Sequence, residues 1–237
     1  MEHLTRACRE FISWFGQQKT GFLYMLTKSD NVDGILNLPH NGHSILTWSL
    51  NQAEVSEKYE IGAPAFERRL EAARKVQNAG YRFRIRLDPI VPIDGWKEAY
   101  RRTIGKIFET IAPESVTIGT LRFEEGLYKM RNTFFQSPEL VELVDSMVPM
   151  FQPKVFPGMR KPKAGNYSFS EGKRAEIFSF AIAEIRKYSD CPIALCKESS
   201  SIWNMVGLDL SKCQCACQLN SVDMTLLGQI EGGETLL

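Results

Sequence analysis

This 237-residue chain lacks the features of a secreted or membrane-spanning protein. It contains no run of about eighteen apolar residues, the length that a membrane helix requires. The N-terminal stretch MEHLTRACREFISWF has no apolar core of a signal peptide. We therefore expect a cytoplasmic protein without a membrane partner, and we interpret its six cysteines as thiols or ligands rather than as disulfides.

Strong net charge and known DNA-binding motifs are also missing. The formal net charge is +1, so no overall field attracts nucleic acid. The sequence shows no helix-turn-helix, zinc-finger or internal-repeat pattern. Any contact with DNA would need a local basic surface, and the segment Lys154–Tyr167 offers one because it mixes basic and aromatic residues. Lys161 and Tyr167 are candidate substrate contacts there; the alternative is a solvated loop.

What the chain does contain is a regular alternation of apolar strands and amphipathic helices. This alternation predicts an α/β fold with parallel strands. The pattern breaks from Met147 into a Pro-, Gly- and Lys-rich stretch, so we expect residues 1–150 to form the main α/β unit and 151–237 a C-terminal α/β extension. The predicted strands are Phe22–Lys28, Ser44–Asn51, Arg82–Ile90, Ser115–Phe123 and Pro192–Cys196, and the predicted helices are His3–Gln18, Pro64–Gly80, Trp96–Thr110, Glu171–Lys187 and Ser200–Val206.

Polar side chains occupy the ends of these strands. Lys28, Ser49, Asn51, Asp88 and Arg122 each close a predicted strand or follow it. Because the carboxyl ends of parallel strands meet at one edge of a sheet, this position is typical of active sites in β/α folds. The alternatives are local: a surface lysine, hydrogen bonds to neighbouring backbone, or a loop cap.

The arginine at the fourth strand end has a local alternative of its own. Arg122 could hold an anion through its planar guanidinium group. It could equally pair with Glu124 or Glu125, which follow it directly.

Four blocks of sequence occur together and in a characteristic order. They are TKSDNVDGIL with HNGHSILTWSLN, FERRLEAARKVQNAGY with DPI and GW, IGTLRF, and LCKESSSIW. They run from about Lys28 towards Cys217 and cover most of the chain, and the first two are the most specific. Together they resemble the spore photoproduct lyase family of radical S-adenosylmethionine (SAM) enzymes.

The resemblance implies a fold, a cofactor and a reaction. It implies a partial (β/α) barrel that binds SAM and an iron–sulfur cluster and that splits a thymine dimer in ultraviolet-damaged DNA. Lys28 and Ser49 resemble the SAM-contacting residues of the family, and Asn51 and Asp88 lie where further SAM contacts are expected. Arg122 lies where a further SAM or substrate contact is expected.

One element of that family is missing from the sequence. Radical SAM enzymes bind a four-iron–four-sulfur cluster through a CxxxCxxC loop, and no CxxxCxxC occurs here. We therefore expect an incomplete barrel, the C-terminal part of a longer family member, that is inactive alone. A separate chain could supply the cluster-bearing part; the remaining alternatives are a SAM- or metal-binding subunit and a degenerate, non-catalytic fragment.

The resemblance also implies where the catalytic residues belong. The hydrogen-donating cysteine and the radical-relay tyrosines of the family precede the region that these blocks match. We therefore expect the catalytic residues upstream of Met1, and we assign none within the 237 residues of this chain.

The late cysteines form a second candidate metal site. Cys213, Cys215 and Cys217 form a CxCxC string, and Cys196 lies upstream. Closely spaced thiols favour zinc or an iron–sulfur cluster. Free thiols are the alternative, because the spacing is not that of a zinc knuckle.

Overall fold

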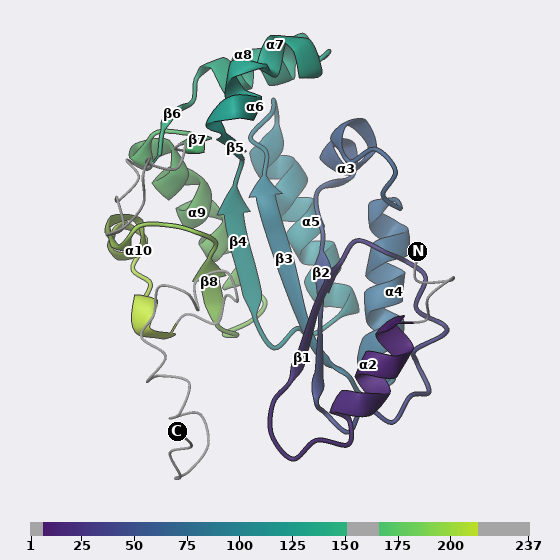
Figure 1. Ribbon diagram of the computed structural model, residues 1–237. Helices are drawn as coiled ribbons and strands as arrows, with labels where there is room; N and C mark the ends of the chain where they lie inside the picture. The colour runs from purple at the N-terminus through teal and green to yellow at the C-terminus, as the bar shows by residue number, and fades with distance from the viewer. Residues whose placement is uncertain (1–6, 151–165, 213–237) are drawn as a thin grey trace, which may run out of the picture.

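The computed structural model describes residues 7–150 and 166–212 (Figure 1). Its central feature is a five-stranded parallel sheet in the order β1-β2-β3-β4-β8. The strands are β1 (Leu23–Thr27), β2 (Ser44–Ser49), β3 (Arg82–Ile90), β4 (Val116–Thr120) and β8 (Ile193–Leu195). The predicted α/β fold with parallel strands is therefore confirmed, and the sheet does not close into a barrel among these residues.

The alternation along β3 explains how the sheet is packed. Phe83, Ile85 and Leu87 are buried in the main hydrophobic core, while the arginines between them lie on the opposite face. Helix α4 packs against β2 and β3, and α5 packs against both α4 and α9. In Figure 1 these helices lie behind the sheet. The helices are α2 (Ala7–Phe15), α4 (Phe66–Asn78), α5 (Trp96–Thr110) and α9 (Glu171–Ile185).

Short elements gather beyond the carboxyl ends of the strands (Figure 1). Most of them were not predicted, because they are too short for a clear periodicity. Among them, α3 begins after Gln52, whose side chain accepts a hydrogen bond from the backbone N–H of Glu54. They comprise α3 (Ala53–Tyr59), β5 (Arg122–Glu124), α6 (Glu125–Lys129), α7 (Arg131–Phe134), α8 (Pro138–Asp145), β6 (Val148–Pro149) and β7 (Asn166–Ser168). After β8 the chain continues into α10 (Ser200–Met205) and a 3-10 turn (Leu210–Lys212).

The predicted strand Ser115–Phe123 is wrong as a single element. Its first part, β4, pairs with β3 and β8 in the large sheet. Its last part, β5, pairs antiparallel with β7 in a separate three-stranded sheet. The break falls at Leu121, whose backbone carbonyl accepts a hydrogen bond from the Ser168 hydroxyl at 2.8 Å. Strand propensity runs through this junction, so only tertiary contacts could reveal the change of sheet.

None of the helices within residues 7–150 and 166–212 has the length and apolar character needed to span a bilayer.

Candidate functional site

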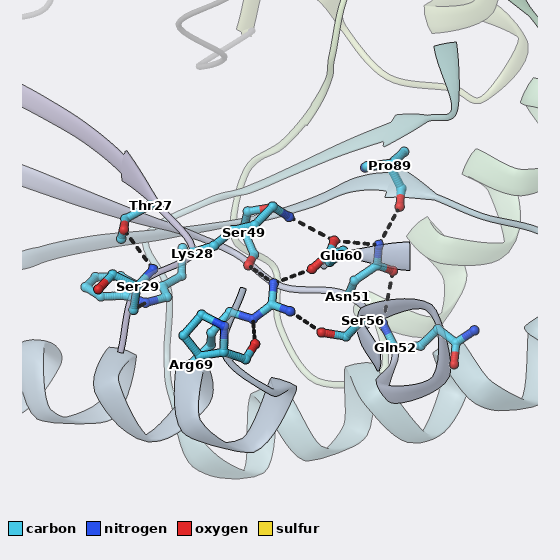
Figure 2. A network of polar contacts seen from close by, with 12 residues as sticks. Thr27, Lys28, Ser29, Ser49, Asn51, Gln52, Ser56, Glu60, Arg69 and Pro89 are labelled. Carbon is cyan, nitrogen blue, oxygen red and sulfur yellow. Dashed lines mark hydrogen bonds and ion pairs between the residues drawn. The ribbon is translucent and has the colours of Figure 1, made fainter. Parts of the chain in front are cut away.

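Lys28 is the centre of a polar cluster at the carboxyl ends of β1 and β2 (Figure 2). Its Nζ donates hydrogen bonds to Ser49 Oγ at 2.9 Å and to Glu60 Oε1 at 2.8 Å. The side chain is 38% exposed, so a ligand can reach it. An ammonium group has three N–H donors, and the described residues use two of them, which leaves one for a ligand.

Glu60 joins Lys28 to a buried arginine. Arg69 on α4 is fully buried, and its Nη1 lies 2.6 Å from Glu60 Oε2. Arg69 also donates hydrogen bonds to the carbonyl oxygens of Pro64 at 2.7 Å and Ser49 at 3.2 Å. Burial alone would raise the pKa of Glu60, yet Lys28 and Arg69 outweigh it and the net shift of that pKa is downward. The carboxylate therefore stays ionised and holds the Lys28 ammonium in place.

Asn51 lies at the next position along this network, and its side chain is occupied by protein groups (Figure 2). Its Nδ2 donates to the Pro89 carbonyl at 3.0 Å, and its Oδ1 accepts from the Tyr100 hydroxyl at 2.5 Å. Burial raises the pKa of Tyr100, so this donor remains protonated. The geometry favours a positioning role for Asn51 between β2 and β3.

A cavity of about 1000 Å³ opens beside this cluster, beyond the strand ends. Lys28, Asn51 and Glu60 form a polar part of its lining. The rest is mainly apolar and comes from α3, the end of β3, the junction of β4 and β5, and the segments around α7 and α8. These residues include Val55, Tyr59, Pro89, Val91, Leu121, Phe123, Phe134, Phe135 and Leu140. A cavity with charged residues at one side and an otherwise apolar lining suits a ligand that has one ionic group and one flat, apolar group.

Asp88 organises a second cluster on the other side of Lys28. Its Oδ2 accepts from Arg86 Nη2 at 2.5 Å, and its Oδ1 accepts from Arg122 Nη2 at 3.2 Å. Arg122 thus pairs with Asp88, not with Glu124 or Glu125. Cys196 completes the cluster: the same two Nη2 atoms lie 2.8 and 3.3 Å from its Sγ.

The close approach of Asp88 to β4 depends on a glycine. A Cβ atom at Gly119 would lie 2.3 Å from Asp88 Oδ1, a distance that no side chain tolerates. Burial by itself would raise the pKa of Asp88, but Arg122, the Cys196 thiol and Arg86 outweigh it and lower that pKa. Asp88 is thus a fixed negative charge between two guanidinium groups.

The remaining candidate residues are only partly placed by the structure. Tyr167 on β7 stacks on Tyr128 with ring centroids 3.8 Å apart. Lys161, Cys213, Cys215 and Cys217 lie outside the described residues. Within the described ranges no group of three His, Cys, Asp or Glu side chains could hold a metal ion. The accessory metal site at the late cysteines therefore remains a prediction.

The expected position of the catalytic residues lies outside the structure as well. The described residues begin at Ala7, so neither Met1 nor any segment before it is described. The expectation that the catalytic residues lie upstream of Met1 stays a prediction. The two clusters supply the candidate binding and positioning residues of the described part of the chain.

Three residues of these clusters were missed by sequence reasoning. Glu60 and Arg69 look like ordinary charged residues, one in a loop and one in an amphipathic helix. Arg86 lies in a strand in which arginines alternate with apolar residues, so the sequence predicts that it faces solvent. Only Arg69 carried a usable signal, because it falls among the apolar positions of α4, next to Leu70.

Comparison with known families shows to which family the chain is related. The family model for spore photoproduct lyase matches residues 1–171. The chain belongs to the spore photoproduct lyase family. Its curated relatives include the spore photoproduct lyases of Geobacillus sp. (strain Y412MC61), 34% identical over 124 residues, and Bacillus subtilis (strain 168), 35% identical over 116 residues. These matches cover 52% and 49% of this chain but only 36% and 34% of the relatives.

Solved spore photoproduct lyases share the fold described above. A structure complexed with dinucleoside spore photoproduct aligns with a TM-score of 0.67 at 23% identity and covers 82% of this chain and 56% of that one. A mutant form with bound AdoMet and dinucleoside spore photoproduct gives the same TM-score and coverage. The parallel sheet with its helices is thus the sheet of this radical SAM family.

Proposed function

We propose that this chain forms the SAM-binding wall of a spore photoproduct lyase-type active site. The observation that carries the proposal is the Lys28 cluster, in which an ammonium held by Ser49 and Glu60 borders an apolar cavity. SAM has a charged amino-acid end and a flat adenine end, so its chemistry fits these two parts. A spore photoproduct lyase mutant has been solved with AdoMet bound.

Each residue of the wall has a distinct role in this proposal. Lys28 pairs with the carboxylate of the amino-acid end, and the Ser49 hydroxyl adds a hydrogen bond. The cavity lined by Tyr59 and Phe123 takes the adenine and excludes water from it. Asn51 and Asp88 keep the strand ends in position. When bound and reduced in this family, SAM supplies hydrogen-abstraction chemistry.

Replacing Lys28 with methionine tests the proposal. We expect SAM affinity to fall by about tenfold or more, because a charge-assisted hydrogen bond is lost while the aliphatic stem remains. Isothermal titration with SAM measures the effect. Lys106→Met is the matched control, since Lys106 pairs with the exposed Glu67 on the helical side of the sheet. If both variants bind SAM with the same affinity, Lys28 is not part of the SAM site.

The iron–sulfur cluster of the family does not fit the described residues. Cys8, Cys191 and Cys196 are the described cysteines, and no three potential ligands converge among the residues that the structure covers. The sequence has no CxxxCxxC either. We propose that the cluster ligands come from another polypeptide segment and that this chain alone does not cleave SAM.

Anaerobic reconstitution with iron and sulfide tests this second part. We expect the purified chain to release no deoxyadenosine from SAM under reducing conditions, while still binding SAM. A solved relative from the family, reconstituted in parallel, serves as the positive control. Deoxyadenosine release by the purified chain, above the level of a no-protein blank, would contradict the proposal.

A role as one subunit of a split enzyme is the second candidate, and the free edge of β1 favours it. Within the described residues β1 pairs only with β2, so one row of its backbone groups faces no strand. Leu26 on β1 is 51% exposed. An unpaired edge with apolar side chains is a template for a further strand. The partner would be a chain that carries the cluster loop.

Damaged DNA is the substrate class that we propose for the assembled site. Solved relatives hold a dinucleoside spore photoproduct. Arg122, Lys161 and Tyr167 are the proposed contacts with this substrate in the present chain. The stacked pair of Tyr128 and Tyr167, with the Arg131 guanidinium 4.5 Å from the Tyr128 ring centroid, offers a flat basic surface of the kind that bases stack on.

A further inference from the structure

A second, smaller cavity lies beside the Lys28 cluster, at the carboxyl ends of β1, β2 and β3. Its volume is about 400 Å³. It differs from the larger cavity in that most of the residues lining it have charged or polar side chains. The lining residues are Leu26, Thr27, Lys28, Ser49, Arg86, Asp88, Arg122, Cys196 and Lys197.

Positive charge is in excess along this lining. Lys28 is balanced by Glu60, which lines the larger cavity only. The other cations of the described lining are Arg86, Arg122 and Lys197, and the lining sets only the carboxylate of Asp88 against them. The Arg86 and Arg122 side chains are only 7% and 15% exposed. Glu198 also interacts electrostatically with Arg122. The lining itself still carries more cationic side chains than carboxylates, and such a surface attracts an anion.

The two guanidinium groups are held in place without any ligand. Asp88 bridges their Nη2 atoms, and Arg122 Nη1 donates to the Cys196 carbonyl at 2.9 Å. Gly119 gives Asp88 the room to lie between them. Guanidinium forks match the geometry of carboxylate and phosphate oxygens. Because the groups are fixed in advance, binding would cost little side-chain entropy.

Lys197 adds a cation at an unusual backbone position. Its φ is +53°, in the left-handed region that non-glycine residues seldom occupy. It directly follows Cys196, so the turn after β8 places both residues at the cavity. A strained conformation that brings a charged side chain to a cavity is typical of functional positions.

We propose that this cavity is an oxyanion site, which binds a phosphate or carboxylate group of the substrate between Arg86, Arg122 and Lys197. The proposal rests on the proposed function only in assigning the anion to the substrate. It separates the two cavities by chemistry: the large one takes an apolar ring, and the small one takes a negative group. It therefore restricts the substrate to molecules with an anionic group.

The direct test titrates the full chain with inorganic phosphate and, separately, with acetate, at constant ionic strength maintained with sodium chloride. We expect saturable heat in isothermal titration for at least one of them. Binding of phosphate alone assigns the site to phosphate groups, binding of acetate alone assigns it to carboxylates, and binding of both leaves the shared oxyanion chemistry. Heats equal to those of chloride dilution for both probes would overturn the proposal.

Two substitutions should move the affinity in opposite directions. Arg122→Gln should weaken binding of the successful probe by about tenfold or more, through loss of a charged donor. Asp88→Asn has nearly the same shape but removes the competing carboxylate, so it should tighten binding by about tenfold. Arg82→Gln is the control, because Arg82 pairs with Glu114 at the far end of the same strand. Unchanged binding of the probe in Arg122→Gln would contradict the proposal.

SAM titrations of the same variants keep the two proposals apart. If phosphate or acetate binds but SAM does not, the proposed function fails and the oxyanion site stands. If SAM binds and neither phosphate nor acetate does, the oxyanion site fails and the proposed function stands. Far-ultraviolet circular dichroism checks that Arg122→Gln is folded. If it is not, Lys197→Ala carries the test, with weaker binding of the probe expected and unchanged binding contradicting the proposal.

Discussion

Replacing Arg69 with methionine is expected to lower the free energy of unfolding by about 3 kcal/mol, because Glu60 loses its buried partner and keeps only the partly exposed Lys28. Arg69 is fully buried on α4 and pairs with Glu60 at 2.6 Å. Its loss also leaves the carbonyls of Pro64 and Ser49 without their donor. Urea unfolding followed by circular dichroism measures the change. The effect should exceed that of any single exposed ion pair in the chain.

The neighbouring Arg68 provides a matched control for this prediction. It lies on the same helix and pairs with Asp30, but its side chain is 72% exposed. Arg68→Met should cost no more than about 1 kcal/mol, as is usual for exposed pairs. Adding Glu60→Gln to Arg69→Met should restore part of the lost stability, because it neutralises the carboxylate that has lost its buried partner, and Lys28 is exposed enough to be hydrated. Equal losses in Arg68→Met and Arg69→Met would show that the buried pair is not a stability determinant.

The fold was predictable where burial follows a simple period. The strand Arg82–Ile90 and the helix Trp96–Thr110 have the predicted bounds, because alternation and helical spacing are complete within each. Prediction failed where contacts with residues distant in sequence determine the secondary structure. The split at Leu121 is the clearest case: one apolar run serves two sheets, and its second half pairs with β7, more than forty residues further along the chain.

The candidate site was predictable in its strand-end residues but not in their partners. Lys28 and Ser49 are hydrogen-bonded to each other, as neighbouring parallel strand ends should be. Glu60 and Arg69, which fix that contact, come from a loop and a helix whose approach depends on the tertiary fold. The pairing of Arg122 with Asp88 instead of Glu124 has the same origin. A prediction from sequence favours ion-pair partners that are close in the chain, whereas the sheet brings together strand ends that are remote in the chain.

A buried carboxyl near the oxyanion cavity predicts a pH-dependent stability. Glu198 pairs with Arg174 at 3.1 Å, and its side chain has no exposed surface. Burial nevertheless outweighs Arg174 and Arg122 and raises the pKa of Glu198 to about 7, from 4.5. The folded state therefore binds this proton more tightly than the unfolded state. Stability from this group is greatest below about pH 4.5 and falls as the pH rises towards 7.

Glu198→Gln should abolish this dependence, since glutamine keeps an oxygen for the Arg174 N–H but does not titrate. Between pH 4.5 and about pH 7 the wild-type protein should lose about 3 kcal/mol of unfolding free energy relative to the variant, at 1.4 kcal/mol per pKa unit. Urea unfolding of both proteins at pH 5 and pH 8 measures the difference. Glu142→Gln, at an exposed position of α8, should follow the wild-type curve. Parallel pH curves for wild type and Glu198→Gln would mean that the carboxyl is ionised in the folded protein at neutral pH, and that its charge compensates the arginines beside the cavity.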